Sequence, residues 1–173
     1  MFLTLAPGVT LPEKLVALLG GFDDGWSYGL GWKIQPLSLQ APDLIGIYPL
    51  SGAQGKQVDC SGMSRWLIYH LTGGVTVIPD GSTNQRGWVE GLGRPNLEGF
   101  QEVPVADGHQ INGVLYIAFL SPTQTNEHIG HVLLLCNGVT YESHGGPGEK
   151  GPDSREWGSE PFMAEMSVYQ MTN

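Results

Sequence analysis

Basic residues are scarce in this sequence. Only 8 of its 173 residues are lysine or arginine, against 17 aspartates and glutamates, so the formal net charge is −9. The basic residues are scattered singly between Lys14 and Arg155, whereas proteins that bind polyanions usually gather them on one face. We therefore expect no nucleic-acid partner and no binding to anionic lipid surfaces.

Cysteines are few, and metal-ligand spacings and long apolar runs are missing. Cys60 and Cys136 are too few for a disulfide framework, and no spacing typical of a metal site occurs. No run of 18 apolar residues is present, and the apolar start of the chain is too short for a signal peptide. We expect no cofactor, no metal and no membrane insertion, and synthesis in the cytoplasm without a signal peptide.

The apolar content that is present suffices for one compact domain over residues 1–173. Hydrophobic residues make up 40% of the chain and charged residues 14%. A domain of about 150 residues buries roughly 70% of the surface of its unfolded chain. The 26 glycines and 12 prolines follow no repeat, which indicates many turns and few long helices.

Two helices are predicted, over Leu11–Leu19 and from Cys60 onward. The apolar face of the second helix consists of Met63, Trp66, Leu67, His70 and Leu71. Cys60 lies at its N-terminus, where free backbone N–H groups and the helix dipole favour a thiolate. A reactive nucleophile is one interpretation of this cysteine, and a small buried core residue is the other.

The segment from Phe22 to Pro42 is rich in aromatic residues and follows neither a helical nor a strand period. We expect an irregular wall there. Its aromatic side chains either pack on the core beneath a loop or face a substrate.

Strands are predicted at four places in the second half of the chain, over Val114–Leu120, Gly130–Cys136, Val139–His144 and Ser167–Met171. An Asn-Gly pair joins the middle two as a hairpin, which puts Cys136 opposite Val139. Because side chains alternate between the two faces of a strand, His131, Glu142 and His144 then share one face. Cys136 points to the other face, and we expect it to be buried and free.

The segment Asp59-Cys60-Ser61-Gly62, followed about seventy residues later by Gly130-His131-Val132, resembles the NlpC/p60-type peptidoglycan peptidases. These are papain-like cysteine hydrolases. The resemblance covers roughly residues 48–146 and includes a tyrosine, Tyr48, twelve positions before the cysteine. The segment Pro79–Gln85 is similar to the one that follows the nucleophile helix in phage-type members.

Two segments depart from the family pattern and leave the substrate preference open. Pro49–Gly52 replaces the aromatic and glycine pair that follows the tyrosine, and Gly113-Val114 replaces the Gly-Asp start of the following strand. The resemblance implies an α+β, papain-like fold in which a central, mostly antiparallel sheet packs against the nucleophile helix. Residues 48–173 would form this catalytic core, with residues 1–47 as a helical and aromatic-rich extension.

The resemblance implies a catalytic role for Cys60 as nucleophile and for His131 as general base and acid. A third polar residue orients the histidine in such triads, and Glu142 and His144 are the two candidates. The register of the hairpin favours Glu142, which lies diagonal to His131 on the same face.

The backbone N–H of Cys60 is expected to stabilise the oxyanion, with the Tyr48 hydroxyl as a second donor. Asp59 and Ser61 either bind polar groups of a peptide stem, as the resemblance implies, or cap the helix, because both residue types are preferred at caps.

The implied function is cleavage of an amide bond in the peptide stem of bacterial peptidoglycan, as an endopeptidase or amidase. A papain-like thiol acyltransferase, or an amidase on another substrate, would use the same residues. An inactive structural or binding module would keep the fold but normally lose one of the catalytic residues. Since peptidoglycan lies outside the cytosol, we expect delivery to the cell wall by lysis, injection or secretion. A delivered lytic effector would have a cognate inhibitor protein in its producer.

Overall fold

The computed structural model describes residues 3–22, 26–31, 33–34, 47–48, 56–91, 100–105, 112–125, 128–145 and 151–171. The helical elements are α1 (Leu11–Leu19), α2 (Cys60–Leu71) and α3 (Ser82–Val89), with the short 3₁₀ helices η4 (Pro122–Gln124) and η5 (Pro161–Glu165). The strands are β1 (Trp26–Tyr28), β2 (Lys33–Ile34), β3 (Ile47–Tyr48), β4 (Lys56–Val58), β5 (Phe100–Val103), β6 (Tyr116–Leu120), β7 (His131–Cys136), β8 (Val139–His144), β9 (Gly151–Glu156) and β10 (Ser167–Met171). The predicted α+β class is confirmed.

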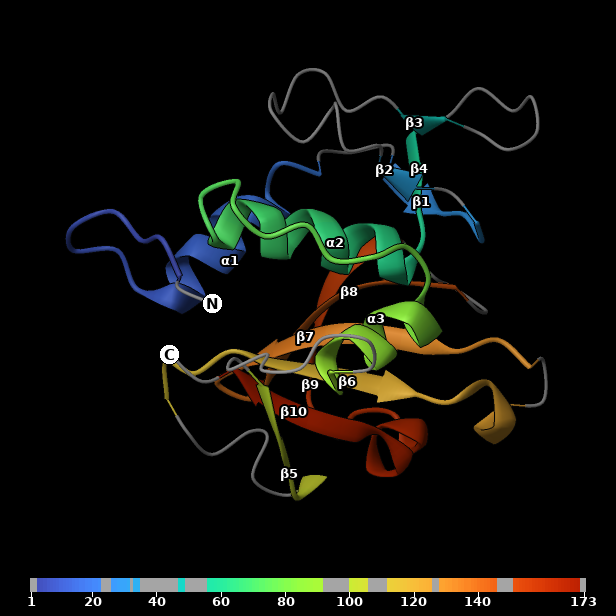
Figure 1. Cartoon of the computed structure of the whole chain (residues 1–173). Coiled ribbons are helices and arrows are strands. Elements are labelled where there is room, and N and C mark those ends of the chain that lie inside the picture. Colours follow the sequence, from blue (N-terminus) through green and yellow to red (C-terminus); the bar gives the residue numbers. More distant parts are fainter. Residues whose placement is uncertain are drawn as a thin grey trace.

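A six-stranded antiparallel sheet is the centre of the fold (Figure 1), with its strands in the order β5-β10-β6-β7-β8-β9. The four strands predicted from the sequence are its central ones, β10, β6, β7 and β8. The outer strands β5 and β9 were not predicted, because their sequences are polar and show no alternation of apolar and polar residues. Two small sheets accompany it: β1 pairs with β4 in parallel, and β2 pairs with β3 antiparallel.

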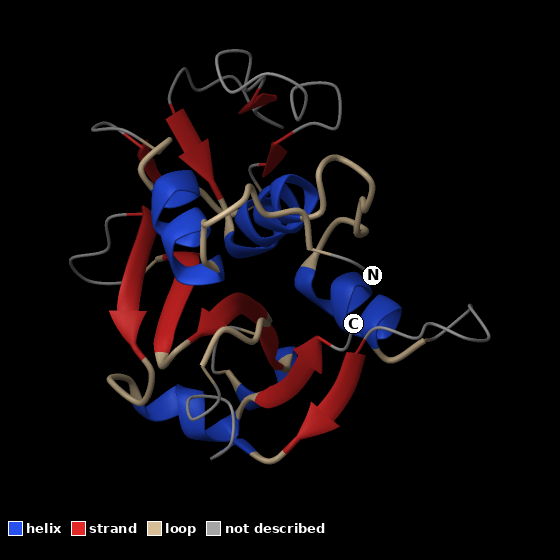
Figure 2. Cartoon of the chain, turned by 90° about the vertical axis from the view of Figure 1, so that its left-hand side faces the viewer, coloured by secondary structure: helices blue, strands red, loops and turns tan. Residues whose placement is uncertain are grey.

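Apolar clusters cover both faces of the central sheet. Between the sheet and the helices α1 and α2, the buried residues include Leu15, Met63, Leu67, Ile117, Val132 and Leu134. On the opposite face, against η5, they include Tyr116, Leu133, Leu135, Met163 and Val168. Figure 2 shows the helical segments on both sides of the strands. Burial on both faces explains why β6 and β7 read as continuous apolar runs.

The hairpin between β7 and β8 has the predicted register. Cys136 pairs with Val139 and Leu135 with Thr140, across a turn in which Asn137 has a positive φ of 53°. Cys136 is fully buried on the α2 side of the sheet and forms no disulfide, as the sequence predicted.

The segment from Phe22 to Pro42, expected to be irregular, contains the short strands β1 and β2, and two of its aromatic side chains pack on the core, one of the two alternatives considered for them. The rings of Phe22 and Trp26 lie edge to face, and Phe22 also contacts Trp66 of α2 at a centroid distance of 4.8 Å. These aromatics therefore belong to the core, while Trp32 lies outside the described residues. Strand β1 forms because it pairs with β4. The backbone of β1 at Ser27 also lies so close to Gly151 that a Cβ on residue 151 would clash with it.

Among the described residues, none of the helices has the length and apolar character needed to cross a lipid bilayer.

Candidate active site

Cys60 is the first residue of α2 and is 5% exposed. Strand β4 leads directly to it, and the Ser143 hydroxyl donates a 2.6 Å hydrogen bond to the carbonyl oxygen of Val58. This contact ties the approach to the helix to β8. The first N–H groups of a helix have no partner within it, so the backbone N–H of Cys60 belongs to a set suited to an anion.

Asp59 caps the helix. Its Oδ1 accepts hydrogen bonds from the Gly62 N–H at 2.8 Å and from the Ser61 hydroxyl at 2.9 Å, and its Oδ2 accepts one from the Gly31 N–H at 3.1 Å. Both Asp59 and Ser61 are buried. These contacts agree with the capping interpretation of the two residues and fix the start of α2 against the N-terminal extension.

His131 is the first residue of β7, and the structure brings it together with Cys60 and Glu142. Its Nε2 lies 2.6 Å from Oε2 of Glu142, which leaves Nδ1 for the thiol of Cys60. Burial favours the neutral ring, but the charges and hydrogen bonds of Cys60 and Glu142 outweigh it and raise the pKa of His131 to about 10. The histidine is therefore arranged to be an imidazolium beside the Cys60 sulfur.

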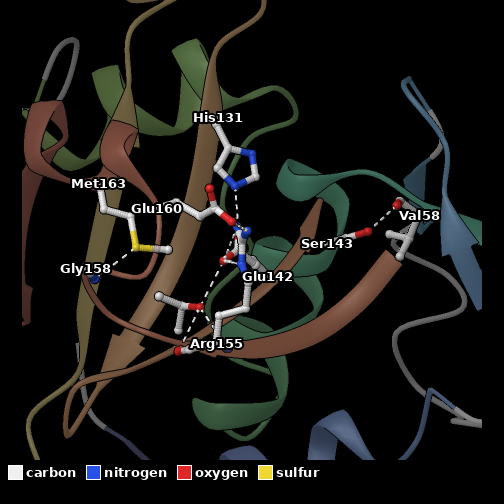
Figure 3. Close-up of polar contacts among 9 residues, drawn as sticks. Val58, His131, Glu142, Ser143, Arg155, Gly158, Glu160 and Met163 are labelled. Atoms are coloured by element: carbon white, nitrogen blue, oxygen red, sulfur yellow. Dashed lines mark hydrogen bonds and ion pairs between the residues drawn. The ribbon is translucent and has the colours of Figure 1, made fainter. Parts of the chain in front are cut away.

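Glu142 lies on β8 with no solvent-exposed surface. Burial alone would raise the pKa of this carboxyl, but the hydrogen bond and charge of His131, together with those of Arg155, lower it to about 2. Figure 3 shows Glu142 between His131 and Arg155. The carboxylate thus stays ionised where it can orient the imidazole and stabilise its positive charge.

His144 does not join the group formed by Cys60, His131 and Glu142. His144 ends β8, and its Nε2 is buried without a hydrogen-bond partner. Burial, followed by the charge of Arg155, lowers the pKa of His144 and favours its neutral form. Tyr48 ends β3, but its side chain lies outside the described residues.

Helix α3, which the sequence did not predict, packs against the start of α2, which carries Cys60, and against the start of β7, which carries His131. The Gln85 side chain is buried, and its Nε2 donates to the carbonyl oxygens of Ser61 at 2.8 Å and Pro79 at 3.0 Å. Ser82 at the start of the helix lies against Gly130, where a Cβ would come within 2.8 Å of the Ser82 Oγ and 3.2 Å of the Leu120 carbonyl oxygen. The glycine before His131 therefore permits a close approach between α3 and the start of β7.

Two further residues hold Glu142 that sequence reasoning missed. The Thr140 hydroxyl donates to Oε1 of Glu142 at 2.9 Å, and Arg155 of β9 contacts the same oxygen through Nε at 3.1 Å and Nη2 at 2.9 Å. The parity of β8 could have indicated Thr140, which is two residues from Glu142. No sequence pattern indicated the position of Arg155, because the strand that carries it, β9, was not predicted.

The ionised state of Glu142 makes the stability of the fold sensitive to acid. Its pKa falls from 4.5 to about 2 on folding, so its contribution is complete above pH 4.5 and is lost as the pH falls toward 2. We expect the unfolding free energy to decrease over this range by on the order of 3 kcal/mol more in the parent than in Glu142→Gln. Urea unfolding from pH 2.5 to pH 7 measures this, and parallel curves for the two proteins would contradict it.

The sequence matches no model of a known protein family, and no curated protein matches it either. Among the described residues, no group of three or more histidine, cysteine, aspartate or glutamate side chains is placed to hold a metal ion. The arrangement of Cys60, His131 and Glu142, with the short motifs around them, is what points to an activity.

Proposed function

We propose that the protein is a papain-like cysteine hydrolase of the NlpC/p60 kind, which cleaves an amide bond in the peptide stem of bacterial peptidoglycan. The observation that carries the proposal is the row formed by a helix-start cysteine, a histidine and a buried carboxylate: Cys60, His131 and Glu142. A nucleophile, a base and a group that orients the base are the parts required for covalent acyl transfer.

The reaction follows from the roles of these three side chains. The Cys60 thiolate attacks the amide carbonyl carbon and forms a C–S bond, while the backbone N–H of Cys60 stabilises the oxyanion. The His131 imidazolium gives its proton to the leaving amine as the C–N bond breaks. His131 then takes a proton from water, which attacks the thioester and releases the acid and the Cys60 thiolate.

Two observations support the family and the substrate class. The nucleophile helix α2 packs against β7 and β8 of an antiparallel sheet, as in a papain-like fold. The motifs Asp59-Cys60-Ser61-Gly62 and Gly130-His131-Val132, whose resemblance to the peptidoglycan peptidases suggested the activity, are the segments that meet at this site.

Digestion of purified peptidoglycan tests the proposal. The protein is incubated with intact sacculi, and the released fragments are identified by mass spectrometry, with Cys60→Ala as the matched control. We expect new amino termini on diamino-acid residues only with the parent protein. A parallel digestion with an added amine acceptor separates hydrolysis from acyl transfer, since transfer would attach the acceptor to the new carboxyl end. No fragments in either reaction would overturn the substrate assignment.

A further inference from the structure

Glu142 uses its two carboxylate oxygens for different partners. Oε2 faces the His131 ring, whereas Oε1 accepts from the Arg155 guanidinium and the Thr140 hydroxyl. The Nε–H of the guanidinium and the Thr140 hydroxyl both donate to this one oxygen, and Nη2 adds an ion-pair contact at 2.9 Å, so the carboxylate is held from one side. The oxygen left over is then directed at the histidine.

The Arg155 guanidinium also has contacts with Glu160 and Phe162, in addition to Glu142. Its Nη1 lies 3.3 Å from Oε1 of Glu160, and its guanidinium lies over the Phe162 ring, 5.7 Å from the ring centroid. The same Phe162 ring packs edge to face against the His131 ring, with a distance of 5.9 Å between ring centroids and an interplanar angle of 90°. Phe162 of η5 therefore contacts both ends of the chain His131–Glu142–Arg155.

Backbone pairing explains why an arginine of β9 reaches this point. Arg155 pairs with Thr140 across the β8–β9 ladder, and its N–H donates to the Thr140 hydroxyl at 3.2 Å. Since Thr140 and Glu142 lie two residues apart on β8, they share a face. The arginine side chain is thereby placed beside the carboxylate.

We propose that Arg155 is a positioning residue of the active site, which keeps Glu142 ionised and aims it at His131. The inference rests on the proposed function and deepens it by extending the triad to a fourth side chain. A buried carboxylate that loses one of its two cationic partners is protonated more easily. Without Arg155, the imidazolium at His131 therefore loses its counter-charge at a higher pH than in the parent.

The pH dependence of Cys60 alkylation by iodoacetamide measures this without any peptidoglycan. Modification of the Cys60 peptide is followed by mass spectrometry from pH 3 to pH 9. Cys136 provides an internal reference, because burial raises the pKa of its thiol to about 11. In the parent, Glu142 stays ionised and His131 positively charged beside the Cys60 sulfur, so the alkylation rate at each pH reports whether this charge arrangement is intact.

Three variants separate positioning from plain structural support. Arg155→Gln removes the charge, Arg155→Lys keeps it but cannot reproduce the planar fork, and Arg86→Met removes an arginine from the Arg86–Glu90 ion pair of α3, away from this network. We expect Arg155→Gln to move the acid limb of alkylation upward by about one pH unit or more. Arg155→Lys should keep the limb near that of the parent but react several-fold more slowly on the plateau, and Arg86→Met should match the parent throughout.

Two outcomes would overturn the positioning role of Arg155, and a third bears on the proposed function. An acid limb of folded Arg155→Gln at the pH of the parent would overturn the proposal, whatever the change in thermal stability. A folded Arg155→Lys protein with the plateau rate of the parent would also overturn it, so the test holds even if Arg155→Gln does not fold. A parent protein whose Cys60 reacts only as an ordinary thiol would instead contradict the proposed function.

Discussion

Replacing Cys60 or His131 by alanine is expected to abolish cleavage of the peptide stem. Cys60 supplies the atom that bonds to the carbonyl carbon, and no neighbouring side chain can take over that bond. His131 holds the proton that the leaving amine needs. By analogy with removal of the nucleophile or the base from a serine protease, each loss should be on the order of 10⁶ in rate.

Rates on one purified muropeptide, followed by mass spectrometry, measure these losses. Cys136→Ala is the matched control, since it removes the other cysteine, which is buried on the α2 side of the sheet. We expect it to keep the rate of the parent while lowering thermal stability through the cavity it leaves. Turnover by Cys60→Ala at the rate of Cys136→Ala would show that the reaction does not use this thiol.

Removing the third residue should reduce the rate without abolishing it. In Glu142→Ala the thiol, the imidazole and the oxyanion donor remain, but the imidazole loses the carboxylate 2.6 Å from its Nε2. We expect a loss on the order of 10² to 10⁴, as for orienting carboxylates in other triads. His144→Ala should lose much less, because burial lowers the pKa of His144 and its Nε2 has no hydrogen-bond partner.

Both variants are measured beside the parent on the same muropeptide. An inactive His144→Ala with a near-normal Glu142→Ala would transfer the orienting role to His144. Near-normal rates for both would mean that a group outside the hairpin orients His131.

The parts of the fold that sequence could predict have strong local signals. The helix at Cys60 shows a clear apolar stripe, and an Asn-Gly turn fixes the register that brings Glu142 to the side of His131. Continuous apolar runs marked β6 and β7, since both of their faces are covered.

The parts that sequence missed depend on tertiary pairing. Strand β9 reads as a polar loop and becomes a strand only by pairing with β8, so the position of Arg155 could not be foreseen. Helix α3 buries just Gln85 and Val89, which leaves too little apolar periodicity for a helix to be recognised. The site was thus predictable where a turn or a helix start set its geometry, and hidden where a neighbouring strand completed it.

The protonation state of His131 is the most direct test of the central claim that Cys60 and His131 form an activated pair. In protein carrying ¹⁵N-labelled histidine, the NMR signals that are missing from His131→Gln identify this ring. We expect both ring nitrogens to be protonated at pH 7 and the ring to lose its proton near pH 10, the value to which Cys60 and Glu142 raise the pKa of His131. A neutral His131 ring at pH 7, titrating near the ordinary value of 6.5, would contradict it.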